Sequence, residues 1–141
     1  MVFYSKSKKE TQKIAANLAA ETKSGVISLE GELGAGKTVF AQAFAKALGV
    51  KSKVKSPTFN LIKRYKILKQ SKYLYHIDCY RLKGYKEAIP LGIKDIFKED
   101  DAIILIEWPE RINEILPKNI IRVHIDHISH NKRKIQISKL K

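Results

Sequence analysis

Residues 31–38 read GELGAGKT, which fits the pattern G-x-x-x-x-G-K-T of a phosphate-binding loop. The pattern constrains the fold because the loop works between a buried strand and the N-terminus of a helix, whose dipole attracts an anion. Its small residues let successive backbone N–H groups turn toward that anion. We expect Lys37 to reach the β- and γ-phosphates of a nucleotide and Thr38 to offer its hydroxyl to Mg²⁺.

The sequence on either side of the loop meets both requirements. Residues 25–29 are a short β-rich run that begins at the turn residue Gly25 and predicts a strand. Residues 37–48 are alanine-rich and predict a helix, which Gly49 ends as a C-terminal cap. A glycine-rich turn that binds nothing would not need this context. The residues predicted to contact a nucleotide along the loop are Glu32, Leu33, Gly34, Ala35, Gly36, Lys37, Thr38 and Val39.

The chain has 141 residues, which is enough for one core, and we predict a single domain over residues 1–141. No run of about 18 apolar residues suggests a membrane-spanning helix, and the N-terminus lacks the order of a secretory signal. The single cysteine, Cys79, excludes an internal disulfide and suits a reducing compartment. We therefore expect a cytoplasmic protein with no membrane partner, in which Cys79 is a small buried hydrophobe.

The formal net charge is +14. The excess is uneven, since residues 33–77 hold ten Lys or Arg residues and no acid, and five more follow Asp126 without an acid. Such a surface attracts polyanions. However, Lys outnumbers Arg 23 to 5, which is typical of a lysine-rich proteome, and no helix-turn-helix, zinc-finger or RNA-recognition motif is present. Repulsion between like charges favours a monomer.

The remaining pattern predicts a P-loop NTPase-like α/β fold, with a mixed sheet and helices on both faces. The direct link between residues 59–67 and 72–78 indicates an antiparallel hairpin, and residues 120–138 suggest another. The predicted strands cover residues 2–4, 25–29, 59–67, 72–78, 102–107, 120–128 and 133–138. The predicted helices cover residues 8–20, 37–48, 85–97 (interrupted at Pro90 and Gly92) and 110–115.

Hydrolysis of a nucleotide needs an acid near the phosphates, and in this architecture such an acid lies at the carboxyl end of a buried strand. Residues 103–106 are aliphatic and lead to Glu107, our first candidate for a Mg²⁺-side carboxylate or for polarising the attacking water. Asp78 ends another predicted strand and is the second candidate. The alternative is a structural ion pair between Asp78 and Arg81. His76 shares a strand face with Asp78, but a lone histidine is more often structural than a base.

For two further side chains the sequence allows two roles each. Thr58 follows Pro57 in a loop after the helix, where a switch hydroxyl could sense the γ-phosphate. Residues 56–58 could equally form a plain turn. Trp108 beside Glu107 either caps the core or faces a partner, and an exposed ring would favour the partner.

Five segments occur in a recognisable order: residues 30–38, EGELGAGKT; 55–59, KSPTF; 74–82, LYHIDCYRL; 91–93, LGI; and 105–111, LIEWPER. On these segments the chain resembles the TsaE family, also called YjeE, over roughly residues 10–117. The later segments are more specific than the phosphate loop alone. Three departures are small. Cys79 stands where a bulkier residue is common, Asn60 replaces a frequent Thr, and the segment after Asp126 is short and basic.

The resemblance implies an ATP-hydrolysing component of the machinery that makes N6-threonylcarbamoyladenosine at position 37 of bacterial tRNAs. Such a component binds ATP or ADP with Mg²⁺ and supports turnover of a threonylcarbamoyl-transferase heterodimer of TsaD and TsaB. Contact with tRNA is then either direct or only through these partners. The resemblance also implies catalytic roles for Lys37, Asp78 and Glu107, Mg²⁺ ligation by Thr38, Asp78 and Glu107, and a nucleotide contact by Thr11.

Two other functions stay open at this point. A small-molecule kinase shares the loop but needs an acceptor pocket and a lid with arginines, for which 141 residues and five arginines leave little room. A nucleic-acid or partner-binding module with a vestigial nucleotide site would suit the basic runs. The intact Lys37, Thr38, Asp78 and Glu107 argue against a vestigial site.

Overall fold

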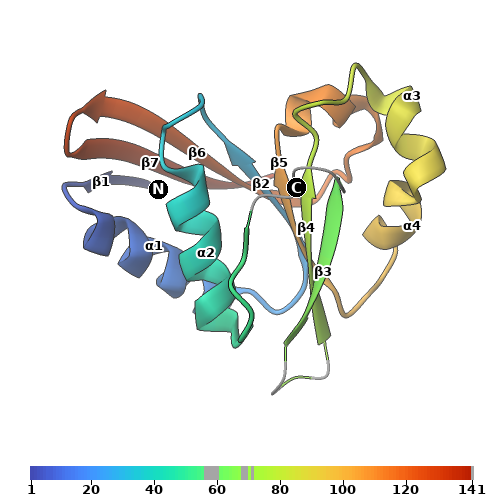
Figure 1. The fold of residues 1–141 in the computed structure, drawn as a ribbon, viewed down its shortest axis with the longest axis horizontal. Helices are drawn as coiled ribbons and strands as arrows, with labels where there is room; N and C mark the ends of the chain where they lie inside the picture. Colours follow the sequence, from blue (N-terminus) through green and yellow to red (C-terminus); the bar gives the residue numbers. More distant parts are fainter. Residues whose placement is uncertain (56–60, 68–69, 71, 141) are drawn as a thin grey trace.

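The computed structural model describes residues 1–55, 61–67, 70 and 72–140. In these residues seven strands form one mixed sheet in the order β1-β7-β6-β2-β5-β4-β3, with helices on both faces (Figure 1). The strands are β1 (Val2–Ser5), β2 (Gly25–Glu30), β3 (Ile62–Ile67), β4 (Lys72–Asp78), β5 (Ile103–Glu107), β6 (Ile120–Ser129) and β7 (Lys132–Leu140). The helices are α1 (Lys8–Glu21), α2 (Lys37–Leu48), α3 (Tyr85–Ala88), η1 (Ile89–Leu91), α4 (Ile93–Phe97) and η2 (Pro109–Ile115). The predicted fold class is confirmed.

The centre of the sheet is parallel. Strand β2 lies between β5 and β6 and runs parallel to both, and β4 runs parallel to β5 on its other side. All five residues of β5 are buried, as its unbroken aliphatic sequence predicts for a central strand covered on both faces. The carboxyl ends of β2, β4 and β5 therefore meet at one edge of the sheet, where the phosphate-binding loop begins.

Antiparallel strands extend the sheet on both sides. Strands β3 and β4 pair as the predicted hairpin, and β6 pairs with β7 as the predicted second hairpin. The first strand, β1, pairs with β7 at the sheet edge. Residues 56–60 lie outside the described residues, so the predicted loop at 56–58, Thr58 with it, and the predicted start of a strand at 59 are not described.

Two cores hold the layers together. Helices α1 and α2 pack on one face, where Phe40 and Phe44 meet Ile27 and Leu105 of the sheet. The short helices α3, α4 and η2 cover the other face (Figure 1), where Ile93 and others meet Ile77, Ile104 and Ile106 of the sheet. Cys79 is fully buried in this second core, as predicted, and burial raises the pKa of its thiol to about 12.

Two predicted helices differ from the structure in detail. The segment 85–97 is three short pieces, because Pro90 lies in the 3₁₀ turn η1 and Gly92 takes a left-handed φ of 78° between η1 and α4. The predicted helix 110–115 is the 3₁₀ helix η2 and not an α-helix. The backbone of Ile112 (φ −128°, ψ 28°) departs from helical geometry and kinks this segment, and Leu116 before Pro117 is extended, so the helix ends there.

The structure also bears on the predicted absence of a membrane segment. In the described part of the chain no helix is long and apolar enough to cross a bilayer.

Candidate nucleotide site

The phosphate-binding loop links the end of β2 to the start of α2, as its sequence predicts. Its shape depends on two glycines. A Cβ on Gly31 would lie 2.5 Å from the backbone oxygen of Ile125, and Gly36 has a φ of 111° at the N-terminal boundary of α2. Both positions therefore require glycine. The tip of the loop is exposed to solvent: Leu33 is 70% exposed, and Glu32 and Gly34 are also exposed.

Lys37 begins α2 and points back toward the sheet. Its side chain is buried, and Nζ donates a hydrogen bond to Gly31 O at 2.7 Å. Burial lowers the pKa of Lys37, while the nearby carboxylates of Glu107, Asp78 and Glu110 act in the opposite direction. A partly desolvated ammonium surrounded by these acids lies where the loop would present a phosphate. Thr38, the next residue of α2, is exposed.

Asp78 and Glu107 end the neighbouring strands β4 and β5 and are register partners, so their backbones lie side by side. Burial raises the pKa of Asp78, and the like charge of Glu107 adds to this rise, while the hydrogen bond from Tyr80 N–H to Asp78 Oδ1 opposes it. The ion pairs between described residues do not include one between Asp78 and Arg81. The structure thus favours the reading in which Asp78 faces the site.

His76 is buried and hydrogen-bonded, as the sequence predicts for a structural histidine, and its partner is the candidate acid Glu107. Its Nε2 lies 2.6 Å from Glu107 Oε2, and both side chains are buried. One pattern in the sequence indicates that His76 lies near Glu107. His76 and Asp78 occupy alternate positions of β4, so both project from the same face toward the end of β5.

Trp108 also lies beside Lys37, a contact that the sequence did not predict. Its ring lies over Lys37, with Nζ 3.8 Å from the ring centroid, and stacks against Tyr80 with ring centroids 5.0 Å apart. The backbone of Trp108 has φ 57° and ψ 52°, the left-handed conformation, directly after β5. This turn swings the ring over the phosphate-binding loop. Trp108 is half-buried, so it neither caps the core fully nor stands free for a partner.

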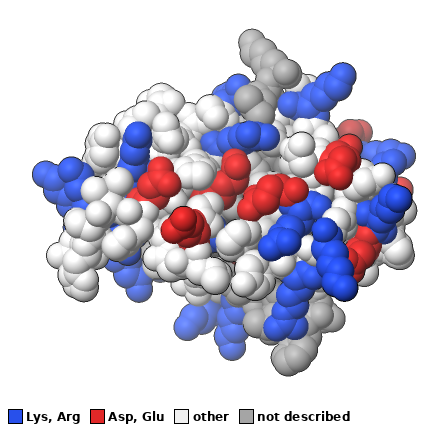
Figure 2. Space-filling model, turned by 90° about the horizontal axis from the view of Figure 1, so that it is seen from above, with Lys and Arg blue, Asp and Glu red and all other residues white. Residues whose placement is uncertain are grey.

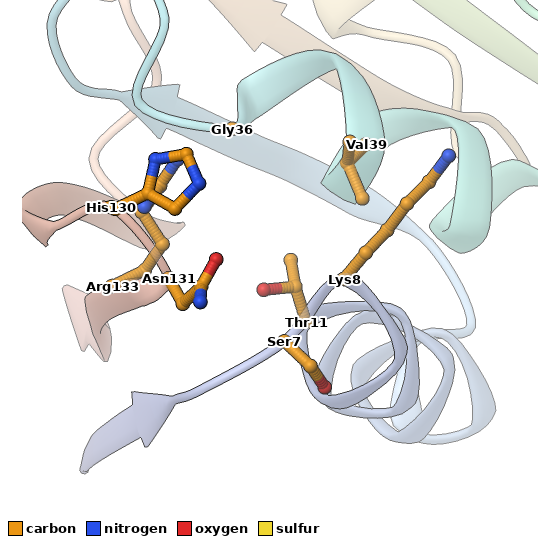
Figure 3. A pocket seen from close by; sticks show the side chains of 8 residues that line it. All are labelled: Ser7, Lys8, Thr11, Gly36, Val39, His130, Asn131 and Arg133. Atoms are coloured by element: carbon orange, nitrogen blue, oxygen red, sulfur yellow. The ribbon is translucent and has the colours of Figure 1, made fainter.

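A pocket of about 230 Å³ adjoins the loop on the side of α1 (Figure 3). The predicted nucleotide contacts Thr11, Gly36 and Val39 line it together with residues of the β6–β7 turn, which the sequence did not single out. Arg133, the second residue of β7, donates from Nε to Ala35 O at 2.9 Å and from Nη1 to Ser129 O at 3.1 Å. In Figure 3 the side chains of Thr11 and Asn131 point toward each other across the pocket. The turn therefore forms one wall of the predicted nucleotide site.

The side chains near the phosphate-binding loop include possible ligands for the predicted Mg²⁺. In the part of the chain that the structure describes, no group of three or more His, Cys, Asp or Glu side chains forms a ready-made cage for a metal ion. Mg²⁺ is usually held by one or two carboxylates together with substrate phosphates. The hydroxyl of Thr38 and the carboxylates of Asp78 and Glu107 are hard oxygen donors of this kind, so the residues present fit Mg²⁺ bound with a nucleotide.

Both acidic and basic side chains lie on the face of the molecule at the carboxyl ends of β4 and β5. Figure 2 looks down on the molecule of Figure 1 from above, where the carboxyl ends of β4 and β5 lie, and shows acidic side chains in a row with Lys and Arg around them. Acidic and basic side chains are therefore mixed on this face.

Comparisons with known proteins agree with one another. The family model described as threonylcarbamoyl adenosine biosynthesis protein TsaE matches residues 5–135. The tRNA threonylcarbamoyladenosine biosynthesis protein TsaE of Bacillus subtilis is 40% identical over 129 residues, which span 89% of this chain and 77% of that protein. The protein of the same name from Aquifex aeolicus is 41% identical over 134 residues, which span 93% of this chain and 90% of that protein. The crystal structure of Bacillus subtilis YdiB superposes with a TM-score of 0.80 at 32% identity and covers 100% of this chain and 86% of that one.

Proposed function

This chain belongs to the TsaE family, as its motifs predict, and we propose that it is the Mg²⁺-dependent ATPase that supports the making of N6-threonylcarbamoyladenosine at position 37 of tRNA. In this proposal it hydrolyses ATP to sustain turnover of the threonylcarbamoyl-transferase complex of TsaD and TsaB. It acts in the cytoplasm as a single domain, and as a monomer when free.

The observation that carries the proposal is the convergence of Lys37 with Asp78 and Glu107 at the end of the phosphate-binding loop. The backbone N–H groups of the loop and the N-terminus of α2 cradle the phosphates. Lys37 exchanges its hydrogen bond to Gly31 O for a phosphate oxygen and stabilises the charge that develops during transfer to water. Bound Mg²⁺ would neutralise charge on the β- and γ-phosphates, with oxygen donors from Thr38, Asp78 and Glu107.

The adjoining pocket supports a nucleoside at the other end of the ligand. It opens beside Gly36 at the foot of the loop, so a nucleotide whose phosphates occupy the loop would extend its base or sugar toward Thr11 and Val39. The side-chain amide of Asn131 offers both donors and an acceptor, which the edge of a base requires. The kinase alternative is less well supported, because a kinase also needs an acceptor pocket and a lid with arginines, for which 141 residues and five arginines leave little room.

The charge of the site's face supports an indirect role for tRNA. Figure 2 shows acidic side chains interspersed among Lys and Arg on this face, which is not the continuous basic patch typical of a nucleic-acid interface. We therefore propose that the partner proteins, and not this face, hold the tRNA.

The test is release of phosphate from Mg-ATP by the purified chain, alone and with the TsaD–TsaB heterodimer. We expect slow release by the chain alone, stimulation by the heterodimer, and loss of both in Lys37→Ala. Phosphoryl transfer to a nucleoside or metabolite would favour a kinase instead. A folded chain with no phosphate release and no affinity for nucleotide would overturn the proposal and leave a binding module.

A further inference from the structure

We propose that His76 is a positioning residue, which holds the Glu107 carboxylate so that its second oxygen faces the metal and phosphates. This inference rests on the proposed function, because it assigns a task to Glu107 at that site. His76 itself would touch neither nucleotide nor metal.

The two side chains meet inside the protein. Nε2 of His76 lies 2.6 Å from Oε2 of Glu107, and the two residues are 1% and 4% exposed. His76 lies opposite Leu105 in the register of β4 and β5, and Asp78 lies opposite Glu107. The histidine therefore stands two residues behind the strand ends, in the layer below the carboxylates.

The surroundings of the ring decide which atom donates. Nδ1 of His76 is buried and has no hydrogen-bond partner among the described residues. A proton on Nδ1 alone would leave a buried N–H group unpaired and would set the lone pair of Nε2 against the carboxylate. The tautomer with the proton on Nε2 avoids both costs, so Nε2–H donates to Oε2.

This bond fixes one oxygen of Glu107 and leaves the other for chemistry. The hydrogen bonds between described residues engage Oε2 and do not engage Oε1. A carboxylate at the end of a strand can rotate about its side-chain bonds, and a short charge-assisted hydrogen bond to one oxygen restricts that rotation. Outer partners of this kind orient metal ligands in proteins, and their removal commonly lowers metal affinity about 10- to 100-fold.

The experiment measures metal binding apart from catalysis. Mn²⁺ binding to the chain saturated with ADP is followed by electron paramagnetic resonance, and ADP affinity in excess EDTA is measured by calorimetry. The variants are His76→Gln, whose amide N–H reaches about as far as Nε2, and His76→Asn, whose shorter amide does not. His76→Leu removes the donor altogether, and thermal melting checks the fold of each.

We expect His76→Asn and His76→Leu to weaken Mn²⁺ binding about 10- to 100-fold while ADP affinity without metal changes less than about twofold. His76→Gln should restore most of the Mn²⁺ affinity. An equal loss of Mn²⁺ affinity and of ADP affinity in EDTA, or no rescue by His76→Gln, would overturn the inference and indicate a purely structural residue. Should His76→Leu fail to fold, the contrast between the Gln and Asn variants still decides. A wild-type chain that binds no ADP would overturn the proposed function itself, and this inference with it.

Discussion

The ammonium of Lys37 lies 3.8 Å from the centroid of the Trp108 ring. The lysine comes from the start of α2 and the tryptophan from the turn after β5, so this contact joins the phosphate-binding loop to the strand that carries Glu107. The face of an indole attracts a cation through its quadrupole, and the contact excludes water from the ammonium. The ring and the carbonyl of Gly31 together hold Lys37 in place.

The backbone of Trp108 gives the first prediction. Because its φ of 57° lies in the left-handed region, any residue with a Cβ is strained there, and glycine is not. Glycine normally destabilises a protein relative to alanine. Here we expect Trp108→Gly to be more stable than Trp108→Ala by about 1 kcal/mol, in urea unfolding followed by circular dichroism. Both variants should be less stable than wild type, since both lose the contacts with Lys37 and Tyr80. The reverse order of the two variants would show that the turn relaxes.

The second prediction compares two glycines with positive φ. A Cβ on Gly31 would lie 2.5 Å from Ile125 O, whereas a Cβ on Gly25 would meet nothing within 4 Å. Gly25→Ala therefore carries a conformational cost of about 1 kcal/mol. Gly31→Ala adds a clash with backbone, and we expect a total loss of about 3 kcal/mol or more. Gly31→Ala should also abolish ADP binding in calorimetry, while Gly25→Ala retains it. Similar losses in both variants would contradict the clash.

The raised pKa of Asp78 gives a prediction about pH. A carboxyl whose pKa is higher in the folded than in the unfolded protein binds more protons when folded, so it lowers stability as pH rises above its unfolded pKa. Asp78→Asn removes this pH-dependent loss of stability and keeps an oxygen that accepts a hydrogen bond from Tyr80 N–H. We expect Asp78→Asn to melt at a higher temperature than wild type at pH 7, and the difference to shrink toward pH 4. Phosphate release should fall in the same variant. A variant that melts lower than wild type at pH 7 would show that the Asp78 carboxylate stabilises the fold.

Sequence alone predicted most of the fold because its signals are local. The aliphatic run of β5, the alanine-rich α2 and the two hairpins are each recognised from one continuous stretch of the sequence. The order of strands placed Asp78 and Glu107 at one edge, since parallel strands of this fold share the direction of their ends.

The parts that sequence did not predict depend on contacts between distant segments. The pairing of His76 with Glu107 joins residues 31 positions apart, and Arg133 reaches Ala35 across 98 positions. No periodicity or motif encodes such a contact. The left-handed turn at Trp108 was also missed, because a bulky residue is rare in that conformation.

The last prediction concerns Arg133, which ties the β6–β7 turn to the phosphate-binding loop. Its Nε donates to Ala35 O while Nη1 donates to Ser129 O, so one guanidinium joins the two segments that wall the pocket. A lysine has a single charged nitrogen and cannot reproduce this fork. We expect both Arg133→Ala and Arg133→Lys to weaken ADP binding about 5- to 30-fold, which corresponds to about 1–2 kcal/mol for hydrogen bonds from a charged donor.

The matched control for Arg133 is Arg122→Ala. Arg122 lies on β6 of the same hairpin, but its neighbour is Glu30, 3.8 Å from Nε, and it does not line the pocket beside the loop. Calorimetry with ADP should give Arg122→Ala an affinity within about twofold of wild type. If Arg133→Lys binds ADP as well as wild type does, charge alone is sufficient at this position and the fork is unnecessary. If Arg122→Ala loses as much affinity as Arg133→Ala, the effect reflects the general positive charge of the hairpin, which attracts a nucleotide without any specific contact.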